Sequence, residues 1–270
     1  PTGPTLGSNR DAEADGQPTA AADGDDDNAT DDEDGVGFGP WIAGQTATVS
    51  VWSTVANAKL DAWIDFNRDG TWDDSAGSVE RIFSGANLPL ANNWNLLTFP
   101  VPAIGAGSLA GITYSRFRIS TAGGLAPTGA AADGEVEDYR GLMRDPAVPT
   151  TIHVAQSWAN PVMGEDPDGP GPAQAYWFDS ADYIQGGVTL SVDGVGDTVS
   201  VGPGTYVENV AVDKDDLILT GASGTATDVV IDGTLLAPGI EILADDVTVQ
   251  HLRVTDSLLS GVSADTVSGL

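Results

Sequence analysis

Residues 65–73 carry oxygen-bearing side chains at alternate positions, a spacing that could bind a metal ion. In a calcium loop of about twelve residues, positions 1, 3 and 5 supply side-chain oxygens, position 6 is a glycine, and position 7 supplies a backbone carbonyl. Gly70 stands at the sixth position counted from Asp65. The spacing therefore predicts a Ca²⁺ site, and an acidic turn between two strands is the alternative interpretation. The candidate ligands are Asp65, Asn67, Asp69, Thr71 and Asp73.

The sequence around this loop differs from an EF-hand. Position 12, where a bidentate Glu completes the coordination, is Ala76, so the last ligand must come from another segment. Residues 60–64 are rich in strand-forming side chains and show no helix cap, which favours a strand. We therefore expect a strand that leads directly into a calcium loop.

The composition excludes several classes of partner. The 270 residues include 40 acidic and 10 basic side chains, and the net charge of −30 repels nucleic acids and anionic lipids. Bound divalent cations or a salty medium would neutralise this charge. The lack of cysteine excludes disulfides and thiolate metal sites, and no apolar run reaches the roughly 18 residues of a membrane span. No signal peptide stands at Pro1, which we interpret as a processed or partial chain.

The densest acidic segment lies within residues 1–35. Glycines bracket residues 24–35, and Phe38 and Trp41 follow at once, so the segment leads directly into a packed strand. Ordering so many carboxylates in one loop costs too much free energy without cations between them, so we expect ion-bound structure. A solvated acidic tail is the alternative. The candidate ligands in this segment are Asp25, Asp27, Asp32 and Asp34.

Alternating apolar and polar residues predict a series of short strands. The alternation in residues 46–51 resumes in residues 59–66 after a turn at 56–58, which predicts a hairpin. Further strands are expected at 79–83, 95–101 and 113–120, a spacing typical of a β-sandwich. Arg116 and Arg118 on the last of these should pair with carboxylates.

Residues 133–139 place two glutamates one strand period apart. In a strand, Glu135, Glu137 and Tyr139 share one face and Val136 points into the core. Two such carboxylates can converge on one ion. Salt bridges to the two arginines of a neighbouring strand are the alternative.

Residues 60–74 and 134–139 together resemble the GEVED domain, a β-sandwich module of secreted and surface-attached bacterial proteins. Residues 11–35 also resemble the acidic segment that precedes this domain in many such proteins, and the resemblance covers about half of the chain. It implies surface display or adhesion and does not imply catalysis. The calcium ligands that it implies are Asp65, Asn67, Asp69, Glu135 and Glu137.

Residues 144–182 differ in composition from the segments on either side. Prolines and glycines are dense from residue 164 to residue 172, which is typical of an irregular link between domains. Asp166 and Asp168 in this link could bind another ion or form a turn. Its aromatic residues would cap the next domain or stack on carbohydrate, and they are Trp158, Tyr176, Trp177 and Phe178.

A repeat with an offset of 30 residues appears in the last third of the chain. Residues 210–219 recur at 240–249, with apolar triplets between turns that contain Asp, and such repetition indicates a solenoid. Residues 183–188, 196–199 and 202–210 resemble the opening coils of right-handed parallel β-helix proteins of the pectate-lyase-like group. The side chains expected to face inward are Val199, Val201, Val210, Val212, Leu217, Leu219, Ile231, Ile240, Ile242, Val247 and Val249.

These patterns predict an all-β protein, with an antiparallel β-sandwich followed by short right-handed parallel β-helix coils. The expected domains are residues 1–143 for the acidic segment and sandwich, 144–182 for the link, and 183–270 for the coils. We expect an extracellular, calcium-stabilised structural or adhesive protein of the cell surface. It would associate head to tail into a polymer or filament, or attach to cell-surface or matrix components.

The alternatives to a structural protein involve polysaccharides. The chain could be the non-catalytic N-terminal part of a β-helix polysaccharide lyase or hydrolase, or a carbohydrate-binding module. Charged residues at 214–216, 245–246 and 253 could form a catalytic site, but Asp at a repeated position more often caps a turn. No nucleophile, base and orienting group stand in a recognisable relation, so we do not predict an enzyme.

Overall fold

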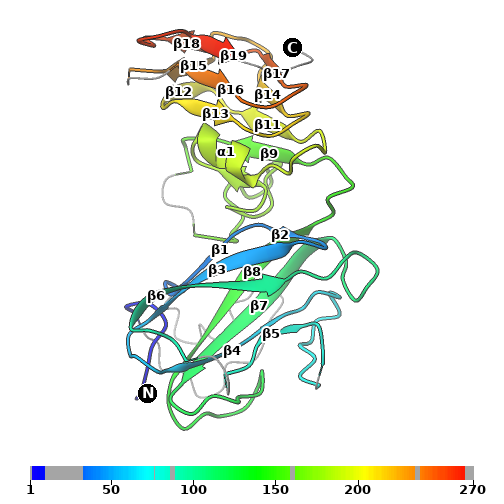
Figure 1. Cartoon of the computed structure of the whole chain (residues 1–270), viewed down its shortest axis with the longest axis vertical. Coiled ribbons are helices and arrows are strands. Elements are labelled where there is room, and N and C mark those ends of the chain that lie inside the picture. Colours follow the sequence, from blue (N-terminus) through cyan, green and yellow to red (C-terminus); the bar gives the residue numbers. More distant parts are fainter. Residues whose placement is uncertain are drawn as a thin grey trace. The chain divides into compact units, whose positions relative to one another are not determined.

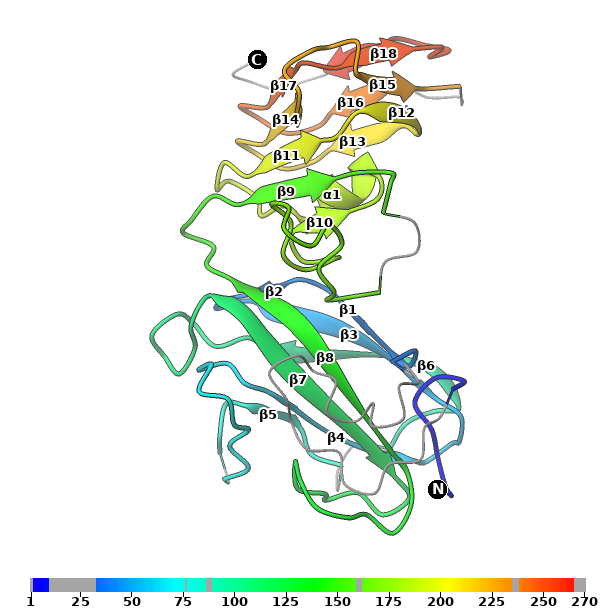
Figure 2. The ribbon, with the colours of Figure 1, turned by 180° about the vertical axis from the view of Figure 1, so that it is seen from behind.

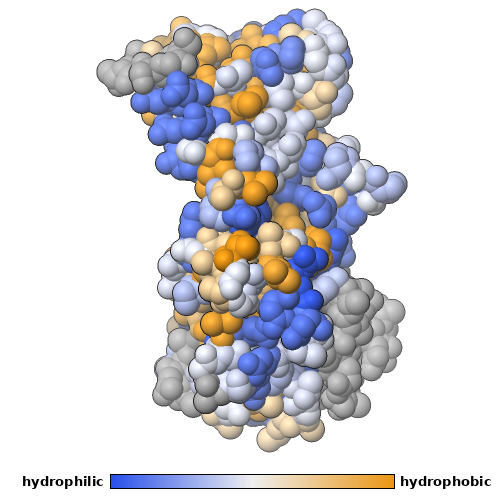
Figure 3. All heavy atoms as spheres, turned by 90° about the vertical axis from the view of Figure 1, so that its right-hand side faces the viewer, coloured by the Kyte–Doolittle hydropathy of each residue, from blue (hydrophilic) through white to orange (hydrophobic). Residues whose placement is uncertain are grey.

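The computed structural model describes residues 2–9, 33–75, 77–85, 89–158, 162–234 and 238–264. The chain divides into two compact units, Pro1–Asp145 and Pro146–Leu270 (Figure 1). Strands dominate both units, and the protein is all-β. Within the described ranges, no helix is long and apolar enough to span a membrane. On the face drawn in Figure 3, hydrophobic and hydrophilic residues are interspersed in both units.

The described residues of the first unit form two sheets. The five-stranded sheet has the order β2-β8-β7-β4-β5, with β2 parallel to β8 and the other pairs antiparallel. The three-stranded sheet has the antiparallel order β1-β3-β6. The strands are β1 (Val36–Phe38), β2 (Trp41–Ile42), β3 (Thr46–Ser53), β4 (Lys59–Ile64), β5 (Arg81–Phe83), β6 (Asn93–Pro100), β7 (Gly111–Ser120) and β8 (Glu135–Arg144).

Aromatic side chains join the two sheets across the core of the sandwich. The ring of Phe38 on β1 lies 5.5 Å from that of Phe117 on β7 and 5.3 Å from that of Tyr139 on β8. Phe83 on β5 contacts Phe99 on β6 at 6.1 Å. Edge-to-face packing of buried rings adds to the hydrophobic stabilisation of the interface between the sheets.

The predicted hairpin between residues 46–51 and 59–66 is wrong. β3 pairs with β1 and β6, whereas β4 pairs with β5 and β7, so the two strands lie in different sheets. The connection between them passes through Asn57, which has a φ of 64° and whose amide donates to the carbonyl of Leu90 at 2.8 Å. A turn signal locates a change of direction, but it does not specify the strand that pairs next.

The second unit contains three parallel sheets, which Figure 2 shows from behind. Their orders are β10-β9-β11-β14-β17, β12-β15-β18 and β13-β16-β19. From β11 onward the chain passes through the three sheets in turn, so each strand pairs with the strand three places later in the sequence. The elements are β9 (Thr151–Val154), β10 (Ser180–Ala181), α1 (Ile184–Leu190), β11 (Thr198–Val201), β12 (Gly204–Val207), β13 (Val210–Val212), β14 (Ile218–Gly221), β15 (Val229–Asp232), β16 (Ile240–Ile242), β17 (Thr248–Gln250), β18 (Arg253–Thr255) and β19 (Val262–Ala264).

The predicted repeat corresponds to strand pairing between coils. Val210 pairs with Ile240 and Val212 with Ile242, so the offset of 30 residues found in the sequence is the length of the coil that separates β13 from β16. The predicted inward residues are buried in the core of the coils, and Val249 is partly buried against it. The alternation of apolar residues thus correctly identified the inner face.

The first coil begins earlier than the sequence suggested. Strand β9 lies within the stretch 144–182 that we expected to be a link, and it pairs in parallel with β11. Residues 184–190, expected to belong to an opening coil, form the short helix α1. The carboxylate of Glu208 accepts the amides of Ile184 and Gln185 at 2.8 and 2.9 Å, which satisfies two donors of the first helical turn.

Candidate functional site

The loop that follows β4 is ordered around the carboxylate of Asp65. The amide of Asp65 donates to the carbonyl of Tyr114 on β7 at 3.0 Å, and the hydroxyl of Thr113 donates to the carbonyl of Asp65. The residue is 4% exposed. Strand β7 of the five-stranded sheet therefore fixes the backbone of Asp65, the first of the predicted ligands.

The next predicted ligands fold back toward Asp65. Its carboxylate accepts the amides of Asp69 at 3.1 Å and Gly70 at 2.9 Å. The side-chain oxygen of Asn67 accepts the amide of Asp69 at 2.8 Å, and the carboxylate of Asp69 accepts both the amide and the hydroxyl of Thr71. Gly70 has a φ of 82°, so the tight turn is built with the glycine that the spacing required.

Glu80 contributes a carboxylate to this loop that sequence reasoning missed. Its oxygens accept the amides of Asp73 at 2.8 Å and Asn67 at 3.4 Å, and the residue is 1% exposed. The carbonyl of Glu80 accepts the amide of Ile64 at 2.9 Å, directly before Asp65. Pairing of β5 with β4 thus brings Glu80 to the loop, whereas the twelfth position of the calcium-loop pattern is Ala76.

Burial makes the ionised forms of two carboxyls in the loop costly. Burial raises the pKa of Asp65, although the amides of Gly70 and Asp69 oppose the shift. Burial also raises the pKa of Glu80, and the negative charges of Asp65 and Asp69 raise it further. By contrast, the hydrogen bond from the Thr71 hydroxyl lowers the pKa of the exposed Asp69.

The donor set of the loop suits a hard cation. Carboxylate, amide and backbone oxygens are the ligands that Ca²⁺ takes in proteins. In the described ranges, however, no three His, Cys, Asp or Glu side chains converge tightly enough to hold an ion by themselves. Backbone carbonyls, the Asn67 amide or water would therefore have to complete the coordination around the carboxylates of Asp65, Asp69 and Glu80.

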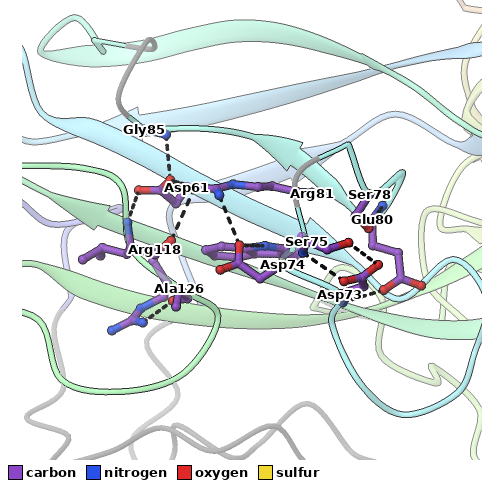
Figure 4. A network of polar contacts seen from close by, with 12 residues as sticks. Asp61, Asp73, Asp74, Ser75, Ser78, Glu80, Arg81, Gly85, Arg118 and Ala126 are labelled. Atoms are coloured by element: carbon purple, nitrogen blue, oxygen red, sulfur yellow. Dashed lines mark hydrogen bonds and ion pairs between the residues drawn. The ribbon is translucent and has the colours of Figure 1, made fainter.

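Beside the loop, arginine neutralises another buried carboxylate (Figure 4). Asp61 is fully buried and accepts a guanidinium nitrogen of Arg81 at 2.8 Å and the amides of Gly85 at 2.7 Å and Leu125 at 3.0 Å. Arg81 also pairs with Asp74 at 3.2 Å and lies over the ring of Trp63. This cluster has its own cation, so we do not assign it to the metal site.

The structure places Glu135 and Glu137 away from the loop. The carboxylate of Glu135 accepts the amide of Leu6 at 2.5 Å, and that of Glu137 accepts the amide of Gly35 at 3.1 Å and the hydroxyl of Tyr139 at 2.9 Å. Glu135 pairs with Ile119 on β7, five residues beyond Tyr114, whose carbonyl accepts the amide of Asp65. Tyr114 and Ile119 lie about 17 Å apart along the strand. Both glutamates hold the segments before β1 against β8.

The expected orientation of Val136 is wrong. Val136 is only half-buried, whereas Glu137 and Tyr139 are buried and Tyr139 contacts Phe38 inside the sandwich. Glu135, Glu137 and Tyr139 do share one face as predicted, but this face, and not that of Val136, is the buried one. Hydrogen bonds from backbone amides compensate for part of the cost of burying them.

The remaining acidic candidates are Asp73 on the loop and four aspartates within the first 34 residues. Asp34 accepts the amide and hydroxyl of Ser8 at 2.9 and 2.7 Å and the amide of Asn9, so it ties residue 34 to the N-terminal segment. Asp73 is exposed and accepts the amide of Ser75 at 2.9 Å. The other predicted ligands within the first 34 residues are Asp25, Asp27 and Asp32, and they lie outside the described residues.

We expect the stability of the first unit to depend on the ionisation of Glu137. Burial raises the pKa of Glu137 well above its ordinary value of 4.5, and the charge of Glu135 raises it further. The native state therefore favours the protonated acid, so its stabilising contribution is complete below pH 4.5 and is lost as the pH rises toward the folded-state pKa. Glu137→Gln should remove this part of the decline in melting temperature above pH 4.5, measured by thermal unfolding in EGTA. An unchanged slope in the variant would contradict the assignment.

The acidic turns of the second unit connect its coils. The amide of Asp215 donates to the carboxylate of Asp193 at 2.7 Å, and the amide of Asp245 donates to the carboxylate of Asp215 at 2.8 Å. Lys214 pairs with its neighbour Asp213 at 3.1 Å. The carboxylate of Asp215 thus bonds to the backbone of the next coil, and the interpretation that the repeated Asp caps its own turn stays a prediction. Asp166 likewise accepts the amides of Asp168 and Gly169.

Residues 59–140 match the model of the GEVED domain family. The matched segment runs from β4 into β8, so it contains the Asp65 loop, Glu80 and both glutamates of the 134–139 motif. No curated protein and no solved structure matches the chain.

Proposed function

We propose that the chain, with its GEVED segment at residues 59–140, is a structural or adhesive module of an extracellular surface protein and that Ca²⁺ stabilises its first unit. The observation that carries this proposal is the pair of buried carboxylates, Asp65 and Glu80, on one loop with further oxygen ligands. Asp65, Asn67, Asp69 and Glu80 would hold the ion. A bound ion would supply positive charge where the loop concentrates negative charge.

The composition supports a role for cations in the folded state. A net charge of −30 opposes compaction, and the Asp65 loop adds carboxylates whose pKa values burial raises. A divalent ion reduces both costs at once. Because the loop lacks the Glu of position 12, we expect a weak site, in the range of about 10⁻⁴–10⁻³ M that is typical of extracellular modules.

The architecture supports a structural use of the module. In the described residues, the carboxylates of Asp193 and Asp215 accept hydrogen bonds from backbone amides of the following coils. Parallel coils stack by backbone pairing, and their edges can add further strands. Association of chains into a polymer, or attachment to cell-surface or matrix components, would use this property.

The proposal predicts that calcium raises the melting temperature of the first unit. With Ca²⁺ at tenfold its dissociation constant, one site adds about 1.4 kcal/mol to the free energy of unfolding. For a unit of this size, that corresponds to a shift of about 3–6 °C. Thermal unfolding should be followed in millimolar CaCl₂ and in EGTA, with NaCl adjusted to equal ionic strength.

Two variants make this test specific to the loop. Glu80→Gln keeps an oxygen acceptor for the amide of Asp73 but removes the charge, so it should abolish the response to calcium. Asp213→Asn removes an equal charge from an exposed position in the second unit and should leave the response intact. Identical melting temperatures of the unmodified chain in calcium and EGTA would contradict the proposal.

A further inference from the structure

The outer face of the three-stranded sheet in the first unit carries exposed aromatic side chains. On β3 and β6 the residues alternate, and Val49, Val51 and Phe99 point into the core. The opposite face consists of cross-strand pairs: Trp52 with Trp94, Ser50 with Leu96, and Thr48 with Thr98. We call these six residues the tryptophan face.

The two indole rings form the centre of the tryptophan face. Their centroids lie 5.5 Å apart with an interplanar angle of 44°. Trp94 is 51% exposed and Leu96 is 74% exposed, on the outermost strand of this sheet. Large apolar side chains left in water beside polar ones mark a binding surface more often than an incidental exposure.

The tryptophan face is uncharged in a strongly acidic protein. None of the three strands β1, β3 and β6 contains a charged residue. Strands of the opposite sheet do, with Lys59 and Asp61 on β4 and Arg116 and Arg118 on β7 as examples. Depletion of charge together with enrichment of tryptophan is the compositional signal of a binding surface.

We propose that the tryptophan face binds an uncharged polysaccharide. Indole rings offer apolar faces against which the C–H faces of sugar rings can stack, and the hydroxyls of Ser50, Thr48 and Thr98 can exchange hydrogen bonds with sugar hydroxyls. The net charge of −30 disfavours nucleic acids and anionic glycans. A neutral glycan meets no such repulsion, and the uncharged strands match it.

The proposal is independent of calcium and can be tested with the full chain. Retention should be measured by affinity electrophoresis and pull-down on cellulose, chitin and β-1,3-glucan, with polygalacturonate as the anionic comparison. We expect binding to at least one neutral polymer and a loss of roughly tenfold or more in affinity for Trp94→Ala, since tryptophan dominates such contacts. Trp177→Ala, the matched variant in the second unit, should bind normally.

Several outcomes would overturn the proposal. They are the absence of retention on every neutral polymer, retention on polygalacturonate alone, or equal retention of Trp94→Ala and the unmodified chain. Sedimentation should accompany these measurements, because a dimer that Trp94→Ala dissociates would make the tryptophan face a protein interface instead. Trp94 is half-exposed, and an unchanged melting temperature of the variant would show that lost binding is not lost folding.

Discussion

Arg116→Ala is expected to reduce the free energy of unfolding of the first unit by about 3–5 kcal/mol, because it leaves a buried charge uncompensated. Arg116 and Asp138 are 1% and 2% exposed, and two hydrogen bonds of 2.7 and 2.6 Å join the guanidinium to the carboxylate. Arg116 also donates to the carbonyl of Pro127 and lies over the ring of Trp72 at 4.7 Å. The substitution would remove all of these interactions.

The pH dependence of this variant gives a second readout. Burial raises the pKa of Asp138, and the hydrogen bond and charge of Arg116 oppose that shift. Without the arginine, the folded-state pKa should rise further, so the loss of stability should be smaller at acidic pH, where Asp138 is protonated, than at neutral pH. Urea unfolding at about pH 4 and pH 7 measures the difference.

Asp74→Asn serves as the control for charge removal. Asp74 pairs with Arg81 at a half-exposed position, and such pairs contribute about 0–1 kcal/mol. If Arg116→Ala and Asp74→Asn cost the same, burial would not be the reason for the effect.

Features set by neighbouring residues were predictable from the sequence. The alternation of apolar residues identified strands β6 and β7 and the inward residues of the coils, because a side chain in a strand faces one side or the other. The turn at Asp65 followed from the glycine at its sixth position. The offset of 30 residues between Val210 and Ile240 was visible because each copy of the repeat corresponds to one coil, and the two copies pair as β13 and β16.

Features that depend on contacts distant in sequence were not predictable. Glu80 reaches the Asp65 loop through the pairing of β5 with β4, which no local pattern specifies. The partners of Glu135 and Glu137 are amides about a hundred residues or more earlier in the chain. The helix α1 contains two adjacent glycines, so its propensity is poor, and capping by Glu208 stabilises it.

Gly134→Ala is expected to destabilise the first unit by about 2–6 kcal/mol, through backbone strain and a steric clash. Gly134 has a φ of 111°, a region that side chains other than glycine rarely adopt. A Cβ atom at this position would lie 1.8 Å from the carbonyl oxygen of Ile119, which belongs to the backbone of β7 and cannot rotate away. The strands would have to separate.

Gly129→Ala separates the two causes. Gly129 has a φ of 89°, but a Cβ there meets nothing within 4 Å, so this variant should show the strain alone, about 1–3 kcal/mol. The excess cost of Gly134→Ala over Gly129→Ala, measured by urea unfolding, is the cost of the clash. Equal losses would mean that the contact with β7 relaxes freely.

Gly134→Ala should also loosen the two segments that contain Leu6 and Gly35, in addition to lowering the free energy of unfolding. Gly134 allows β8 to lie against β7 so that Glu135 stands opposite Ile119 and Glu137 opposite Phe117. In that register the two carboxylates accept the amides of Leu6 and Gly35. Hydrogen exchange at these two amides should therefore accelerate in Gly134→Ala more than in Gly129→Ala under conditions where both remain folded. Equal protection in the two variants would show that the glycine does not position the glutamates.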